Sequence, residues 1–128
     1  MINANLEQFL DTGWFSESTL YLNGYTYWCE GGWDRTTKKP FHVVVYRYRS
    51  ILLTDKEGEI WSKRLIENGD VVDYSTVLDI CGNNEDEVKE QFFKAKIFDG
   101  KSFWEVEKEI AWYDETWLKM AAINFSLL

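Results

Sequence analysis

The chain has 128 residues, 45% of them hydrophobic and 17% aromatic, and its 22 acidic and 14 basic side chains give a formal net charge of -8 at pH 7. A chain of this length buries a core without a metal or a disulfide scaffold, and its single proline and many aromatic residues exclude a disordered protein. Met1–Leu10 lacks the basic start and apolar run of a secretory signal, and no stretch is apolar enough to cross a membrane. We therefore expect one cytoplasmic domain over residues 1–128.

The first part of the chain predicts a short helix followed by paired strands. Residues 2–12 place apolar side chains at helical spacing before Gly13, a residue that commonly ends helices. The Asn23-Gly24 dipeptide favours the tight turn of a hairpin, and residues 31–40, which begin with two glycines and end with the only proline, are expected to form an exposed loop. Short connections make consecutive strands pair antiparallel, as a meander. The expected strands are 19–22, 25–29, 41–49, 51–54, 59–66 and 71–78.

After Gly82 the apolar spacing changes from the period of a strand to that of a helix. Asn83 or Asn84 is a suitable N-cap for a helix that ends near residues 99–100. Ser102 and Glu105 form a capping-box pattern at the start of the next helix, and Asp114 is a candidate cap for a last one. The order of elements predicts an α+β domain: an antiparallel meander sheet of about six strands, with a short N-terminal helix and two or three C-terminal helices packed on one face.

The negative charge is confined to the second half of the chain. Residues 1–64 hold eight acids and eight bases, whereas residues 65–128 hold fourteen acids and six bases. Acids at helix starts complement the helix dipole and keep a domain soluble, but a row of helical carboxylates also attracts a basic partner and steers its approach. The candidate partner-binding residues are Glu85, Asp86, Glu87, Glu90, Glu105, Glu109, Asp114 and Glu115.

This charge pattern leads to the first hypothesis of function. The acidic balance argues against direct binding to duplex DNA, because such binding relies on Lys and Arg at the phosphates. A basic protein, such as a nuclease, is the more suitable partner. In size and charge the chain is similar to small acidic proteins that block nucleases, including phage inhibitors of CRISPR effectors and the immunity partners of nuclease toxins. We therefore expect a non-enzymatic inhibitor whose acidic helical face binds and blocks a nucleic-acid-binding protein.

The aromatic residues of the predicted sheet give an alternative hypothesis. Tyrosines fall at alternate positions of two predicted strands, so each pair shares a face of the sheet. Such residues pack half-buried in many sheets, but exposed rings with nearby arginines also stack on bases and sugars. The alternative is a domain that binds a small ligand or a single-stranded nucleic acid. Its candidate residues are Tyr25, Tyr27, Trp33, Tyr46, Tyr48, Arg47 and Arg49.

An enzyme is the least favoured class. His42 is the only histidine, and Cys29 and Cys81 lie too far apart in sequence for a zinc site built from close pairs. Without a secretory signal, and in a domain large enough to be stable, both cysteines are expected to be free buried thiols. The composition allows one Cys29–His42 dyad. Asp79 followed by Glu87-Val88-Lys89 resembles the D…ExK arrangement of restriction-type nucleases, but here the triplet falls in a predicted helix instead of a strand. We expect no catalytic residue, no metal and no cofactor.

The last stretch of the chain, residues 117–128, is more apolar than a free terminus. It either packs on the core of its own domain or forms a surface for a homodimer or another partner. The sequence leaves both interpretations open.

Overall fold

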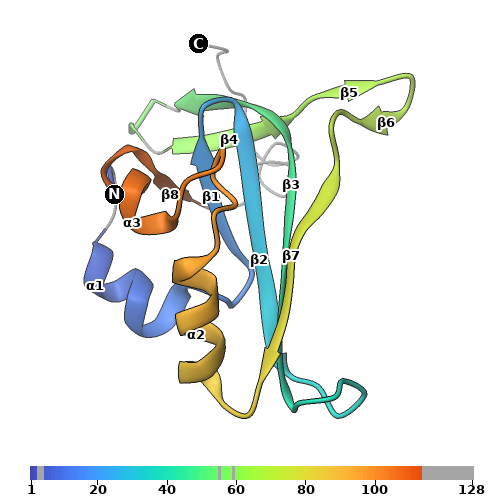
Figure 1. Ribbon diagram of the computed structural model, residues 1–128. Coiled ribbons are helices and arrows are strands. Elements are labelled where there is room, and N and C mark those ends of the chain that lie inside the picture. Colours follow the sequence, from blue (N-terminus) through green and yellow to red (C-terminus); the bar gives the residue numbers. More distant parts are fainter. Residues whose placement is uncertain (3–4, 55, 59, 114–128) are drawn as a thin grey trace.

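Helices cover one face of a curled antiparallel sheet (Figure 1). The structure is a computed structural model and describes residues 1–2, 5–54, 56–58 and 60–113. The strands are β1 (Ser18–Leu22), β2 (Tyr25–Trp33), β3 (Phe41–Thr54), β4 (Ile60–Arg64), β5 (Ile66–Glu67), β6 (Asp70–Val71), β7 (Ser75–Gly82) and β8 (Ala111–Tyr113). The helical segments are α1 (Leu6–Gln8), the π-helical turn η1 (Phe9–Gly13), α2 (Glu85–Lys94), α3 (Phe103–Val106) and the short turn η2 (Glu107–Glu109). None of these helices has the length and apolar character needed to span a bilayer.

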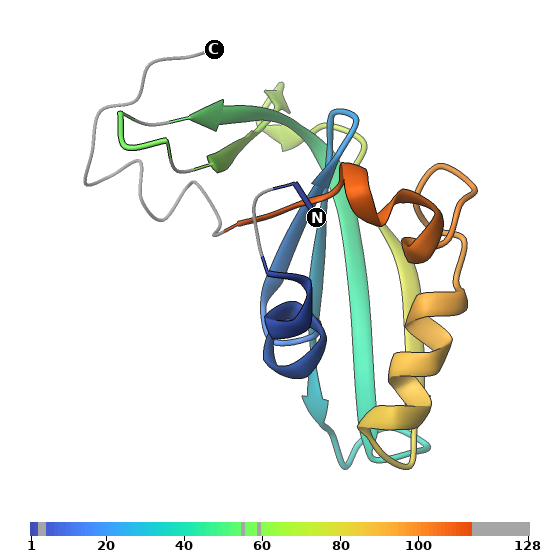
Figure 2. The same cartoon turned by 90° about the vertical axis from the view of Figure 1, so that its left-hand side faces the viewer.

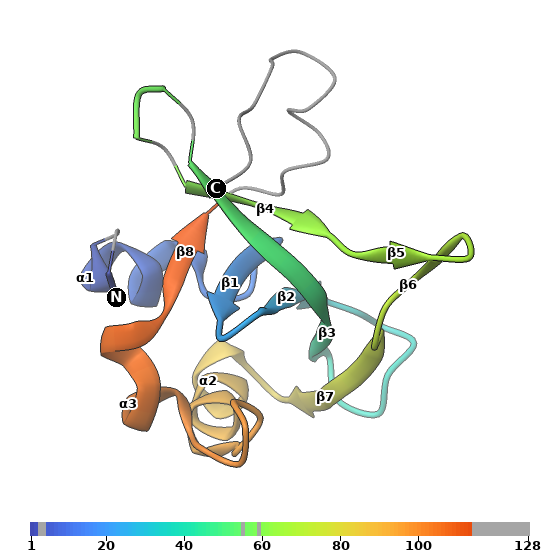
Figure 3. The same ribbon diagram turned by 90° about the horizontal axis from the view of Figure 1, so that it is seen from above.

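The sheet is organised around the long strand β3. The strand order is β4-β3-β2-β1-β8, and β7 also pairs with β3. β1 and β2 form the expected hairpin, in which Asn23 and Gly24 adopt φ angles of 49° and 84° that suit a tight turn. The two halves of β3 have different partners, because β7 pairs with Phe41–Arg47 and β4 pairs with Ser50–Thr54. The sheet curls along this path until β4 approaches β8 (Figure 3).

The main core lies between the sheet and the helices. Successive side chains of a strand point to opposite faces, and several odd-numbered residues of β2 and β3, among them Cys29, Val43 and Val45, are fully buried on the helical side. Aromatic rings supply most of the helical contribution, and the ring of Phe92 lies 5.1 Å from that of Trp14. In Figure 2 the helices are seen in front of the sheet that they cover. The fully buried aromatic residues of this core are Phe9, Trp14, Tyr27, Phe92, Phe98 and Phe103.

A small cluster of buried hydroxyl groups forms hydrogen bonds between β4 and β8, the two ends of the curled sheet, and the strands β2 and β3 between them. The Thr26 hydroxyl lies 2.7 Å from the Ser50 hydroxyl, 3.2 Å from the Ser62 hydroxyl and 2.5 Å from the Tyr113 hydroxyl. The Thr19 hydroxyl donates to the Tyr113 carbonyl. Buried polar groups are stabilising only when paired, and here β2, β3, β4 and β8 satisfy one another.

The coarse fold class predicted from the sequence is confirmed, since an antiparallel sheet carries helices on one face. Two predicted helix starts are also confirmed. The Asn84 side chain accepts a hydrogen bond from the Glu87 amide at 3.0 Å, and the Glu105 carboxylate accepts one from the Ser102 amide at 3.2 Å. Both thiols are free, but of the two only Cys29 is buried as expected, since Cys81 is partly exposed.

Several boundaries differ from the prediction. The expected loop over residues 31–40 is shorter, because the glycines at 31–32 continue β2 and pair with β3. The ranges 41–49 and 51–54 form one strand, and β7 pairs with β3 instead of following β4 in a meander. The helix that begins after Ser102 ends at Val106, and the chain returns as the unpredicted strand β8 beside β1. The helix expected from Asp114 and the apolar stretch 117–128 lie outside the described residues.

Candidate functional site

The sheet has a second face, opposite the helices, which we call the open face. Directly opposed residues of antiparallel strands share a face. Even-numbered residues of β2 and β3 therefore form rows on this side, and β7 continues each row on the other edge of β3. Within the described part of the chain, the helices pack on the other face (Figure 2). The rows of the open face are Trp28, Tyr46 and Thr76; Glu30, Val44 and Asp79; and Gly32, His42 and Cys81.

One end of the open face holds a cavity of about 380 Å³. The row opposite His42 has no side chain on β2, because Gly32 occupies that position with a φ angle of 155° that favours glycine. Gly31 brings the two backbones close together, since a Cβ atom there would lie 2.6 Å from the His42 carbonyl oxygen. A Cβ atom at Gly32 would meet nothing within 4 Å, so the missing side chain at this position leaves the hollow. Its border includes Glu30, Gly32, Trp33, Asp34, His42 and Tyr46.

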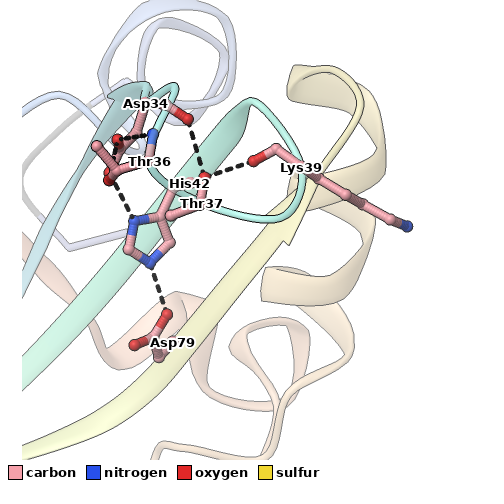
Figure 4. A network of polar contacts seen from close by, with 6 residues as sticks. All are labelled: Asp34, Thr36, Thr37, Lys39, His42 and Asp79. Atoms are coloured by element: carbon pink, nitrogen blue, oxygen red, sulfur yellow. Dashed lines mark hydrogen bonds and ion pairs between the residues drawn. The ribbon is translucent and has the colours of Figure 1, made fainter.

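His42 is held between two carboxylates beside this cavity (Figure 4). Its Nε2 atom lies 2.6 Å from Asp79 Oδ1, and its Nδ1 atom lies 3.5 Å from Asp34 Oδ2. Thr36 fixes Asp34 by donating from its hydroxyl at 2.6 Å and its amide at 2.9 Å. These bonds from Thr36, the hydroxyl first, lower the pKa of Asp34, so this carboxylate stays charged. The imidazole is thus positioned by charge on both sides, and only its protonated form donates to both carboxylates.

The electrostatic environment of this end of the face is negative. Loss of solvation raises the pKa of Tyr46, and the nearby charges of Glu30 and Asp79 raise it further. The Glu30 side chain is exposed and makes no hydrogen bond or ion pair with any described residue. Its carboxylate is available to a ligand.

The other end of the open face is aromatic, and we call it the aromatic shelf: Trp28, Tyr46, Tyr48, Tyr74 and Arg64. The exposed Tyr74 ring stacks on Tyr46 at 5.8 Å and on Tyr48 at 6.3 Å between ring centroids. The Arg64 guanidinium lies 4.9 Å from the Tyr48 centroid and 5.6 Å from the Trp28 centroid. Stacked rings with a guanidinium group beside them favour the recognition of flat or cationic groups.

The aromatic residues proposed from the sequence do not share one surface. Tyr46 and Tyr48 belong to the open face, but Tyr25 and Tyr27 are paired in register with Arg49 and Arg47 on the other side of the sheet. Tyr48 and Tyr27 are fully buried, and burial raises the pKa of Tyr27. The Tyr25 ring has the Arg47 guanidinium at 4.5 Å and the Arg49 guanidinium at 4.2 Å, and Arg49 also pairs with Asp73 at 3.2 Å. Of the seven residues, Trp33 and Tyr46 border the cavity.

The carboxylates proposed on α2 are mostly used inside the molecule. Glu85 accepts a hydrogen bond from the indole of the buried Trp14 at 3.1 Å. Glu87 accepts from the Asn83 amide at 2.8 Å, which lowers the pKa of Glu87. Glu90 pairs with Lys94 at 2.6 Å, and this partner lowers the pKa of Glu90. Of the four acids on this helix, only Asp86 is exposed and has no hydrogen bond or ion pair with a described residue.

Of the other proposed carboxylates, one is bonded within the molecule and one is exposed. Glu105 accepts from the Ser102 amide in the capping box, and this bond lowers the pKa of Glu105. Glu109 is exposed at the end of η2. Asp114 and Glu115 lie outside the described residues.

The helical side also has a cavity, of about 480 Å³, between η1, α2 and α3. Its apolar part is formed by Leu10, Phe93 and the exposed Trp104. Lys89 and Lys94 border it together with acids of α2, so its rim carries both signs of charge. This mixture does not select a basic partner.

The residues considered for catalysis are not brought together. Cys29 is buried in the core on the opposite face from His42, and burial raises the pKa of its thiol. Cys81 shares the open face with His42, but the two ring nitrogens face Asp34 and Asp79. Asp79 is on the open face, whereas the Glu87-Val88-Lys89 triplet is on α2, across the sheet. No group of three or more His, Cys, Asp or Glu residues suited to a metal ion occurs within the described ranges.

No family model, no curated protein and no solved structure matches this chain. Its function is therefore inferred from its own residues.

Proposed function

We propose that this chain is a non-enzymatic binding protein that blocks a basic, nucleic-acid-binding protein such as a nuclease, and that the open face makes the main contact. The observation that carries the proposal is the continuity of this face. A carboxylate-lined cavity and an aromatic shelf share Tyr46 and lie side by side on the sheet face that none of the described helices covers. Tyrosine, tryptophan and arginine dominate the energetic centres of protein interfaces, and all three are present here.

The acidic helical surface has a different part in this proposal. Its exposed carboxylates, which include Asp86 and Glu109, contribute to the net charge of -8, which attracts a basic protein from a distance. Long-range attraction raises the association rate, whereas the affinity depends on the buried contacts. We therefore place the contact on the open face and the steering on the helices. The two free thiols suit a reducing compartment, and we propose the cytoplasm.

The proposal is tested by capture from a bacterial lysate with two matched variants. Tyr74 on the aromatic shelf and Trp104 on the helical side are each 54% exposed, so neither truncation opens a buried core. We expect Tyr74→Ala to retain a basic nucleic-acid-binding protein about tenfold less than the parent chain, and Trp104→Ala to retain it normally. Purified partner and parent chain together should then show loss of the partner's nucleic-acid cleavage or binding. Equal retention by both variants, or a captured protein whose activity is unchanged, would overturn the proposal.

A second candidate function is the binding of a small ligand or a single strand of nucleic acid on the aromatic shelf. The stacked Tyr46 and Tyr74 rings, inclined by 20°, together with Arg64 favour it, since such a surface accepts a base. The carboxylates at the cavity end oppose a phosphate backbone there. Titration of a labelled oligothymidylate and of free nucleotides, followed by anisotropy and tryptophan fluorescence, decides between the two. Flat titrations remove the second candidate.

A further inference from the structure

We infer that the cavity on the open face receives the guanidinium group of an arginine side chain displayed by the basic partner. This rests on the proposed function and adds the chemistry that the partner must present. The cavity is at the lower end of the roughly 300–1,000 Å³ range of small-molecule sites, which suits one side chain better than a large ligand.

The charge of the cavity is the first reason. Asp34 and Asp79 flank the His42 imidazole, and Glu30 lies on the same cavity border, so these four side chains together stay negative even when His42 is protonated. Asp34 and Asp79 are already engaged with His42, but Glu30 has no such contact with a described residue. Glu30 can therefore pair with an incoming guanidinium group, through two parallel hydrogen bonds, without breaking an existing ion pair.

Within the described structure, no lysine or arginine of the chain itself neutralises the carboxylates at the cavity. Lys39 points away from the His42 cluster (Figure 4), and no lysine or arginine belongs to the border of the cavity. Arg35 and Lys38 are exposed on the loop that follows β2. The complementary charge must therefore come from another molecule.

The walls of the cavity select the type of cation. Trp33 is 70% exposed at the end of β2, with its ring held edge-on against Phe41 at 5.2 Å, and Tyr46 borders the other end. A guanidinium group is flat, stacks on aromatic rings and pairs with a carboxylate through two parallel hydrogen bonds. A lysine ammonium group is more strongly hydrated and has no flat surface for the rings. The combination of rings and carboxylates favours arginine.

The test uses N-acetyl-arginine amide, with N-acetyl-citrulline amide as a neutral probe of nearly the same shape and N-acetyl-lysine amide as the other cation. Binding is followed by amide chemical shifts of the ¹⁵N-labelled full chain. We expect the arginine probe to move the amides of Glu30, Gly32 and His42 with a dissociation constant on the order of 1 mM, and the other two probes to move them at least about fivefold more weakly. Equal effects of arginine and citrulline, or of arginine and lysine, would overturn the inference.

Two variants test whether the arginine probe binds at the cavity. Glu30→Gln keeps the shape of the side chain and removes its charge, so it should weaken the arginine probe by about fivefold or more. Asp86→Asn on α2 is the matched control, because it removes one exposed carboxylate from the opposite side, and it should leave the affinity unchanged. Equal losses in both variants would show attraction by net charge alone and overturn the assignment.

The reactivity of the two thiols gives a second, independent measure of probe binding. Cys81 lies opposite His42 on the open face and is partly exposed, whereas Cys29 is fully buried. The arginine probe should slow alkylation of Cys81 by iodoacetamide, and Cys29 should remain unreactive with or without it. If no probe affects Cys81 or the cavity amides while Tyr74→Ala still weakens capture of the partner about tenfold, this inference fails and the proposed function stands. Unchanged capture by Tyr74→Ala overturns the proposed function whatever the probes do.

Discussion

The helical side and the open face of this protein carry similar residues, but these residues differ in whether they are bonded within the molecule. Both carry carboxylates and aromatic rings, but on the helical side Glu85 is bonded to Trp14, Glu87 to Asn83 and Glu90 to Lys94. On the open face the exposed Glu30 carboxylate borders a cavity without a bond to a described residue. The density of charge along a sequence therefore does not show how many carboxylates are available to a binding partner. Their availability depends on whether they already form hydrogen bonds or ion pairs within the molecule.

The largest effect expected is loss of stability on the helical side. Phe92 is fully buried among Trp14, Phe93, Phe98 and Phe103. Phe92→Ala removes these contacts and leaves a cavity, so the free energy of unfolding should fall by about 3–5 kcal/mol. Urea denaturation followed by circular dichroism measures it. The matched change on the open face, Tyr74→Ala, should cost less than about 1 kcal/mol, and a similar loss for both would remove the contrast between the two sides.

The next effect concerns the close approach of β2 and β3. A Cβ atom at Gly31 would lie 2.5 Å from a Val43 methyl group and 2.6 Å from the His42 carbonyl oxygen. Gly31→Ala must push the strands apart, and we expect a loss of about 1–3 kcal/mol in the free energy of unfolding. The amides of His42 and Val43 should also exchange faster with solvent. Normal stability of Gly31→Ala would show that the backbone approach does not shape the cavity.

A smaller difference in stability is expected between variants of two neighbouring acids of α2. Glu85→Ala leaves the indole NH of the buried Trp14 without its acceptor and should destabilise the fold by about 1–2 kcal/mol. Asp86→Ala removes an exposed side chain and should change stability by less than about 0.5 kcal/mol. Thermal unfolding of the two variants at pH 7 compares them. Equal stability would contradict the structural use of the α2 acids.

The parts of the fold that were predictable from the sequence are the local ones. The Asn23-Gly24 turn, the cap at Asn84 and the capping box at Ser102 each depend on residues a few positions apart, and all three are present. The pairing of β8 with β1 joins residues ninety or more positions apart, and no local pattern encodes it. A three-residue strand also has too few positions to show an alternation.

The candidate site was missed for a related reason. The two glycines before Trp33 indicated a loop, so no residue of the preceding strand was expected opposite His42. Once Gly32 is paired with His42, strand alternation puts Glu30 and Tyr46 on the same face, so the glycine pair was the available signal. The position of Asp79 depends on β7 pairing with β3, and that pairing was not predictable from adjacent turns.

The smallest effect expected is a pH dependence at the rim of the cavity. Hydrogen bonds from Thr36 lower the pKa of Asp34, so the folded state favours the charged carboxylate. A group of this kind adds stability above its ordinary pKa of about 3.9 and loses it as the pH falls through the lowered value. Asp34→Asn should therefore be less stable than the parent chain at pH 6, and the difference should shrink as the pH falls below the ordinary pKa of the carboxyl group, about 3.9. In a Thr36→Val background the difference should be smaller at every pH, because the hydroxyl bond is absent while the amide bond remains. Melting temperatures of the four chains from pH 2 to pH 7 give the comparison. A pH-independent difference would show that Asp34 acts through its shape, and the charge assigned to this rim would then rest on Glu30 and Asp79 alone.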